Sequence, residues 1–143
     1  METKVYLAGG MNKSNWQQRV INEILSPETI NQNNEKFIFY NPREHELIDS
    51  KQFTLWDLFY VEKCDILFAY MQEDNPSGFG LTLEIGFARA LHKPIILVDE
   101  KSNNDKTFER YFKIVRESAS IVFEDINDGI NFLKKIRNGI IML

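Results

Sequence analysis

The stretch DNPSGFGLTLEIGFARALHKPIILVDE, residues Asp74 to Glu100, decides the fold. A glycine-rich turn leads into an apolar segment of helical period, from about Phe79 to Leu91. Pro94 then opens the apolar run PIILVD, which reads as a buried strand. A turn, a helix and a buried strand in this order are typical of one repeating unit of an α/β protein.

The same alternation runs through the whole chain and predicts five strands separated by helices. The strands are expected at KVYLAG (4–9), KFIFYNP (36–42), DILFAYM (65–71), PIILVD (94–99) and ASIVFED (119–125). The helices are expected at 14–25, 53–63, about 79–91, 105–118 and 128–138. Ser14 and Gln17 have the spacing of a capping box, which predicts the start of the first helix. The segment REHELIDSK is polar and fits no single element.

Five strands alternating with helices imply a parallel sheet covered by helices on both faces. We expect residues 1–143 to form a single flavodoxin-like α/β domain with the strand order 2-1-3-4-5. In that order the ligand crevice lies where the carboxyl ends of the first and third strands meet. The loops there are AGGMNK and QEDNPSGFG. The candidate substrate-binding residues in these loops are Gly9, Gly10, Asp74, Ser77, Gly78, Phe79 and Gly80.

Composition excludes several classes of function. The net charge of −4 argues against a binder of nucleic-acid polymers or anionic membranes, which attract positive surfaces. No apolar run has the roughly 20 residues of a membrane span, and the N-terminus has no signal-peptide layout. The single cysteine, Cys64, indicates a reducing compartment, so a cytoplasmic location is expected. Cys64 itself is predicted to be a core residue. One cysteine and two histidines argue against a His/Cys metal site.

Glu84 is a carboxylate inside the apolar segment LTLEIGFA. Its neighbours one helical turn away are Gly80, Leu81, Phe87 and Ala88, none of which is basic. One interpretation places it in solvent near the helix start, where the helix dipole favours a negative charge. The other places it at the crevice, where partial desolvation makes a carboxylate more basic and more nucleophilic.

Asp57 occupies an inward position in the predicted helix Phe53–Lys63, which is apolar nearly all round and therefore expected to be largely buried. Burial of this acid costs free energy unless a partner compensates it. A structural role would have it accept a hydrogen bond from a loop amide or from the indole of Trp16 or Trp56. A functional role would place it at the crevice.

Tyr6 lies near the carboxyl end of the first strand, either as a core residue with a satisfied hydroxyl or as part of the crevice. In the second case Glu84, Asp57 and Tyr6 converge from three elements. Two carboxylates and an orienting phenol suit glycosidic bond cleavage, in which one carboxylate attacks the anomeric carbon and the other assists the leaving group.

Competing catalytic motifs are missing from the sequence. The loop AGGMNKSN is rich in glycine but is not G-x-G-x-x-G, and neither a P-loop nor a G-x-S-x-G elbow occurs. A Rossmann dinucleotide site, a P-loop nucleotide site and a serine-hydrolase site are therefore not expected.

The motifs KVYLAGG, DLFYVEKCDILFAY and SGFGLTLEIGFARALHKPIILV together resemble the nucleoside 2-deoxyribosyltransferases and their relatives, the 2'-deoxynucleoside 5'-monophosphate N-hydrolases. The resemblance covers roughly residues 4 to 99. It implies a nucleophilic glutamate at Glu84, in the Gly-x-Gly-x-x-x-Glu-x-Gly setting of residues 78–86. It also implies a base-side aspartate at Asp57, eight residues before Asp65, and a tyrosine at Tyr6 that orients the nucleophile.

The sequence departs from the family pattern at two positions. A sugar-binding Asp or Ser six residues before the nucleophile is replaced by Gly78, for which Ser77 or Asp74 is a candidate substitute. The nucleotide hydrolases carry an Arg in the loop after the first strand, and here that loop offers only Lys13, which favours an unphosphorylated nucleoside. The family also implies a homo-oligomer whose neighbouring subunit completes the site, and the apolar tail IIML is expected to dock.

The resemblance implies an enzyme that cleaves 2'-deoxynucleosides through a covalent deoxyribosyl-glutamate intermediate and passes the sugar to another nucleobase or to water. Its partners are small molecules, the nucleoside and the nucleobase, and the chemistry requires no cofactor and no metal. Trp16, Trp56 and Phe79 are candidates for stacking on the base. The alternatives are a nucleotide N-hydrolase, a TIR-like NAD glycohydrolase and a non-catalytic nucleotide-binding module.

Overall fold

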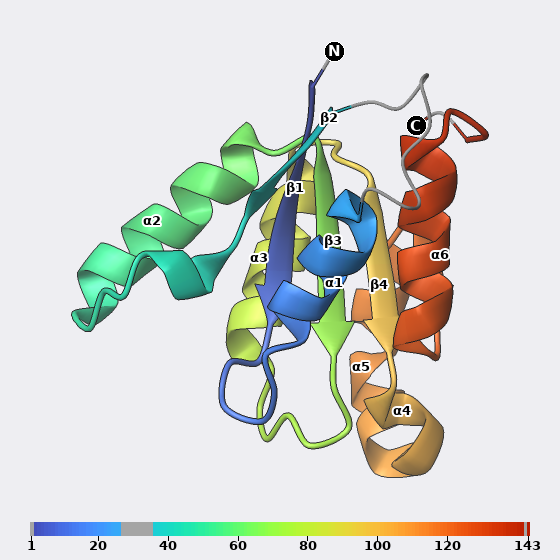
Figure 1. The fold of residues 1–143 in the computed structure, drawn as a ribbon. Helices are drawn as coiled ribbons and strands as arrows, with labels where there is room; N and C mark the ends of the chain where they lie inside the picture. The colour runs from blue at the N-terminus through green and yellow to red at the C-terminus, as the bar shows by residue number, and fades with distance from the viewer. Residues whose placement is uncertain (1, 27–35, 142) are drawn as a thin grey trace.

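The computed structural model describes residues 2–26, 36–141 and 143. Its centre is a parallel five-stranded sheet with the order β2-β1-β3-β4-β5, which confirms the predicted flavodoxin-like order (Figure 1). The strands are β1 (Glu2–Gly9), β2 (Lys36–Tyr40), β3 (Ile66–Met71), β4 (Ile95–Asp99) and β5 (Ile121–Phe123). All five predicted strands are present.

The helices are α1 (Trp16–Leu25), η2 (Pro42–Glu44), α2 (Ser50–Lys63), α3 (Phe79–Ala90), α4 (Lys101–Asn104), α5 (Lys106–Ser118) and α6 (Ile126–Arg137). The 3-10 helix η2 and the short helix α4 were not predicted. Helices α1 and α6 cover one face of the sheet, and α3 and α5 cover the other (Figure 1). Strand side chains alternate between the two faces: Val5 and Leu7 join the core under α1 and α6, and Tyr6 joins the core under α3.

Three predicted helix starts were wrong by two or three residues. Helix α2 begins at Ser50 rather than Phe53, because Asp49 accepts from the backbone N–H of Gln52 and caps it. Helix α1 is capped by Asn15, whose side chain accepts a hydrogen bond from the backbone N–H of Gln18 at 3.2 Å, and not by Ser14. Ser14 is instead hydrogen-bonded to the side chain of Gln72. Helix α6 begins at Ile126 because Asp125 accepts from the N–H of Asn127 at 2.7 Å and so caps the helix earlier than its glycine suggested.

The prediction that the helix around Asp57 is largely buried was wrong. In α2 only Val61 is fully buried, and Leu55 and Phe59 remain 72% and 47% exposed. Helix α2 extends outward from the edge of the sheet beside β2, so most of its circumference has no layer to cover it (Figure 1). Its apolar residues are therefore available to solvent in the single chain.

Among the described residues, no helix is both long and apolar enough to cross a membrane. The same part of the chain contains no cluster of three or more His, Cys, Asp or Glu residues suited to a metal ion. Cys64 is buried and its thiol donates to the carbonyl of Val61 at 3.0 Å, which confirms the prediction of a core cysteine.

Candidate active site

A cavity of about 480 Å³ lies at the carboxyl ends of β1 and β3, where the strand order predicts the ligand crevice. The loops that follow these two strands lie at the bottom of Figure 1 and form one side of the cavity. Helices α2 and α3 form the other side. The lining residues are Tyr6, Gly9, Gly10, Met11, Asn12, Pro42, His45, Leu47, Phe53, Asp57, Asn75, Ser77, Gly78, Phe79, Gly80, Leu81 and Glu84.

Glu84 enters the cavity from the second turn of α3. The helix packs Leu81, Ile85 and Ala88 against the sheet, and Glu84 is on this buried side with 8% of its surface exposed. Its Oε2 atom is buried and has no hydrogen-bond partner in the described chain. The interpretation that Glu84 extends into solvent was therefore wrong.

Burial raises the pKa of Glu84 from an ordinary 4.5 to about 8. The nearby Tyr6 hydroxyl lowers this pKa because it favours the charged form, and the negative charge of Asp57 raises it further. A carboxylate with such a pKa is more basic than one in water, and basicity favours nucleophilic attack.

Tyr6 comes from β1 and is fully buried, with its side chain on the α3 side of the sheet. Its hydroxyl has no hydrogen-bond partner of normal geometry in the described residues, although it is close enough to Glu84 and Asp57 to change their pKa values. Burial, followed by the charges of Glu84 and Asp57, raises the pKa of Tyr6. The phenol therefore stays protonated and is available as a donor.

Asp57 comes from α2 and is half-buried, with an Oδ1 atom that is buried and not hydrogen-bonded. Burial raises the pKa of Asp57, and His45 and the Tyr6 hydroxyl oppose this shift. The structural alternative involving Trp16 was wrong, because the Trp16 indole N–H donates to the carbonyl of Gly10 at 3.0 Å. Trp16 packs against Phe68 and Tyr70 on the far side of the sheet, so it is not a residue that could stack on a base in this cavity.

His45 was missed by sequence reasoning because its segment fitted no element. It follows η2, and its Nε2 atom lies 3.5 Å from Oδ1 of Asp57. The backbone N–H of Leu47 donates to Nδ1 at 2.8 Å, which leaves the proton of the neutral ring on Nε2. The imidazole also packs edge-on against Trp56. A usable signal was present: His45 follows the second strand, and parallel strands all end at the same edge of the sheet.

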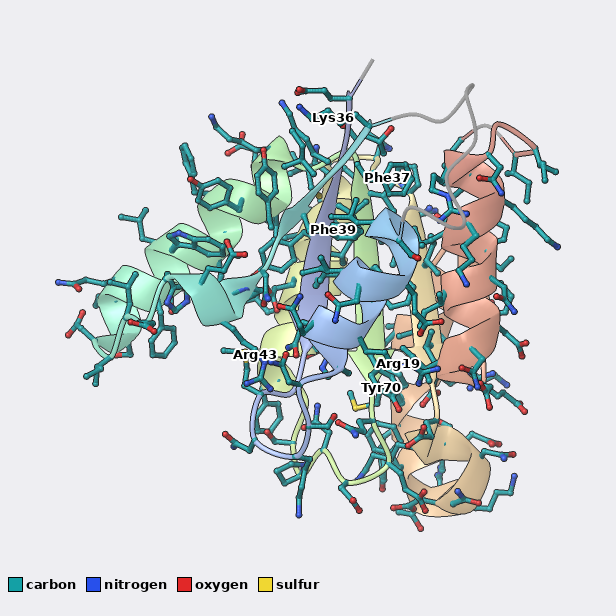
Figure 2. All side chains as sticks on the ribbon, in the orientation of Figure 1. Arg19, Lys36, Phe37, Phe39, Arg43 and Tyr70 are labelled. Atoms are coloured by element: carbon teal, nitrogen blue, oxygen red, sulfur yellow. The ribbon has the colours of Figure 1, made fainter. Side chains whose placement is uncertain are left out.

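The loop after β1 is fixed by Arg43 and Gln17. Arg43 Nη2 donates to the carbonyl of Met11 at 2.7 Å, and Arg43 Nε donates to Gln17 Oε1 at 2.8 Å. Figure 2 shows Arg43 beside this loop, which it reaches from η2. Gln17, fully buried, donates in turn to the carbonyl of Gly10. The loop that forms one wall of the cavity is thus held in a single shape.

A family model described as "Nucleoside 2-deoxyribosyltransferase like" matches residues 2–102, most of the chain. The chain belongs to the nucleoside 2-deoxyribosyltransferase-like family. This confirms the resemblance noted in the sequence and supports N-glycosidic bond cleavage or deoxyribosyl transfer as the class of activity. A search of curated proteins found no match.

Three solved structures share the deoxyribosyltransferase fold. A 2-deoxyribosyltransferase from Bacillus psychrosaccharolyticus has a TM-score of 0.62 and 23% identity over 90% of this chain and 91% of its own. A 2-deoxyribosyltransferase from Leishmania mexicana has a TM-score of 0.63 and 12% identity, covering 93% and 97%. A CMP N-glycosidase from Clostridium botulinum has a TM-score of 0.55 and 18% identity, covering 92% and 98%.

The structure brings together the three residues predicted as catalytic and all but one of those predicted to bind substrate in this deoxyribosyltransferase-like chain. The exception is Asp74, which is exposed and does not line the cavity. The next residue, Asn75, is buried and lines it instead. Asn75 was missed because neighbouring polar residues of a turn are not distinguished by sequence alone.

Proposed function

We propose that the protein cleaves the N-glycosidic bond of 2'-deoxynucleosides and transfers the deoxyribosyl group to another nucleobase. One observation carries this proposal. Tyr6 Oη, Asp57 Oδ1 and Glu84 Oε2 come from β1, α2 and α3, are buried in one cavity, and have no hydrogen-bond partner among the described residues. Buried polar atoms are normally hydrogen-bonded, so three buried atoms without a hydrogen-bond partner in one cavity indicate a binding site for a polar ligand.

In the first step the Glu84 carboxylate attacks C1' of the sugar. The bond between C1' and the base nitrogen breaks, and its electron pair leaves with the base. Asp57 donates its proton to the departing base, and the Tyr6 hydroxyl keeps the attacking carboxylate in line. The product is a deoxyribosyl ester of Glu84, with the positive charge that develops at C1' shared by the sugar ring oxygen.

In the second step a nitrogen of an incoming base attacks C1' from the face that the first base left. The ester bond breaks, Glu84 recovers its carboxylate, and the proton of the incoming base passes to Asp57. Phe79, 80% exposed at the cavity rim, offers a ring face on which either base can stack. Water in place of the second base converts the same site into a hydrolase.

The protein is also proposed to function as a homo-oligomer. Helix α2 and the two helices on one face of the sheet, α3 and α5, carry large apolar side chains in contact with solvent. They are Leu55 and Phe59 of α2, Phe79 and Leu83 of α3, and Tyr111 and Ile114 of α5. Large apolar side chains exposed on neighbouring helices are typical of a subunit interface, and a second copy would remove them from water. Phe79 also lines the cavity, so this interface would lie beside the site.

Incubation with deoxyinosine and free adenine tests the activity. Formation of deoxyadenosine supports transfer, and deoxyribose without deoxyadenosine indicates hydrolysis. In a separate incubation with NAD, consumption of NAD by a protein that leaves deoxyinosine intact would support the TIR-like alternative. Intact-protein mass spectrometry should find one deoxyribosyl group on Glu84. Glu84→Gln should abolish the adduct and the reaction, and Glu117→Gln, an exposed carboxylate of α5, should change neither. Cleavage that persists in Glu84→Gln would refute the nucleophile, and the absence of any cleavage would favour a binding module.

A further inference from the structure

Gly78 leaves the start of α3 without a side chain to contact substrate. Its φ of +71° is in the left-handed region, and a Cβ atom there would lie 2.3 Å from the methyl carbon of Met71. Met71 is fully buried and has little room to move. The first backbone N–H groups of a helix have no acceptor within it, and Gly78, as the N-cap residue, has no side chain to supply one.

Asn75 fills the space beside this uncapped helix start. Its side chain lies between the loops after β1 and β3: a Cβ on Gly10 would be 3.5 Å from Asn75 Nδ2, and one on Gly78 would be 4.0 Å from it. Asn75 is 8% exposed and lines the cavity that also holds Glu84.

The orientation of Asn75 is set by its other polar groups. Oδ1 accepts from the N–H of Ser77 at 3.4 Å, the backbone N–H donates to Gln72 at 2.9 Å, and the carbonyl accepts from Lys101 Nζ at 3.0 Å. Nδ2 has no hydrogen-bond partner within the described chain. Nδ2 is not fully buried, so the donor half of this amide is open to the cavity and can donate to an acceptor on a ligand.

The charge of the cavity decides which acceptor fits. Its described lining includes the acids Asp57 and Glu84 but no Lys or Arg. Two basic side chains near the cavity are engaged elsewhere, because Arg43 binds the loop after β1 and Lys101 binds the carbonyl of Asn75. Lys13 is exposed in the loop after β1 and does not line the cavity. A phosphate would bring about two further negative charges beside two carboxyl groups, and a sugar hydroxyl brings none.

The geometry points to Asn75 as the residue that binds a hydroxyl group of the deoxyribose, beside the free N–H groups at the start of α3. This contact makes the site select a nucleoside over its 5'-monophosphate. This inference rests on the proposed function and assigns the sugar end of the same site. It places the sugar hydroxyl at Asn75 and C1' at Glu84.

The kcat/KM values of wild type, Asn75→Ala and Asn75→Asp test the inference on a 2'-deoxynucleoside and on its 5'-monophosphate. Wild type should prefer the nucleoside. Asn75→Ala should lower kcat/KM for the nucleoside about 10- to 100-fold, because one hydrogen bond is lost. Asn75→Asp should retain more activity than Asn75→Ala, since a hydroxyl can donate to a carboxylate and a phosphate cannot. Asn103→Ala, at an exposed asparagine of α4, should have no effect.

Two truncated substrates, a 2',3'- and a 2',5'-dideoxynucleoside, identify the hydroxyl. One of these substrates lacks the hydroxyl that Asn75 binds. Wild type should cleave that substrate as slowly as Asn75→Ala cleaves the intact nucleoside. Asn75→Ala should cleave the same truncated substrate no more slowly than wild type does. The inference is overturned if wild type prefers the monophosphate, if Asn75→Asp is worse than Asn75→Ala, or if both truncated substrates react as fast as the parent. The last outcome needs no variant, so it decides even if a variant fails to fold. Absence of cleavage of every substrate would instead refute the proposed function.

Discussion

The Nε2 atom of His45 lies 3.5 Å from Oδ1 of Asp57, although the two residues come from separate segments, the turn after η2 and helix α2. Because Leu47 donates to Nδ1, the ring presents its Nε2 proton toward the carboxyl group. In the proposed reaction His45 is therefore a positioning residue that holds Asp57 toward the leaving base.

His45→Ala should lower kcat on deoxyadenosine about 10- to 100-fold, because Asp57 loses the group that orients it. The same variant should differ little from wild type on 7-methyl-2'-deoxyguanosine, whose cationic base leaves without a proton. Asp57→Asn should show the same contrast between the two substrates. Steady-state kinetics on both substrates make the measurement. An equal loss on both would mean that His45 supports the fold rather than base departure.

Tyr6→Phe should move the acid limb of the profile of kcat/KM against pH to higher pH. The Tyr6 hydroxyl lowers the pKa of Glu84 by stabilising its charged form, so removal of the hydroxyl raises that pKa and delays formation of the nucleophile. In wild type the limb should fall near pH 8, the value about which Glu84 titrates. Tyr111→Phe, at a tyrosine 73% exposed on α5, is the control. A limb at the same pH in wild type and Tyr6→Phe would contradict this assignment.

Glu84→Gln should make the stability of the protein less dependent on pH. The folded-state pKa of Glu84, about 8, is above its ordinary 4.5, so the folded state binds this proton more tightly than the unfolded state does. Stability from this group is complete below pH 4.5 and is lost as pH rises to about 8, at a rate of about 1.4 kcal/mol per pH unit at most. Urea unfolding of both proteins from pH 4.5 to 9 measures the effect. Parallel profiles would show that Glu84 has an ordinary pKa.

Leu55→Glu or Leu83→Glu should convert the proposed homo-oligomer to monomers, because each change places a charge among the exposed apolar side chains of α2 and α3. Leu25→Glu, 44% exposed on the opposite face of the sheet, should leave the assembly intact. Sedimentation velocity at several protein concentrations gives the mass of each species. A monomeric wild type would exclude the proposed homo-oligomer. Dissociation by Leu25→Glu alone would place the interface on the opposite face.

Much of the fold was predictable because strand and helix periods are local. The run ILFAYM is continuously apolar since β3 is covered on both faces, and the alternation of elements then implies a parallel sheet with a crevice at one edge. Helix α2 shows the limit of this reasoning. An apolar helix reads as buried, but whether a layer covers it depends on where it lies relative to the sheet, and Leu55 is exposed because α2 leaves the sheet edge.

The sequence by itself determined the order of strands and helices, because strand and helix periods are local. It predicted the strand order that the structure confirms, and it gave the convergence of Tyr6, Asp57 and Glu84 on one edge as one of two interpretations. Only the tertiary structure decided that His45 faces Asp57, that Asn75 rather than Asp74 faces the cavity, and that Trp16 faces away from it. These outcomes depend on side-chain directions in turns and across the sheet. Such directions are set by packing between segments distant in sequence, which no local pattern encodes.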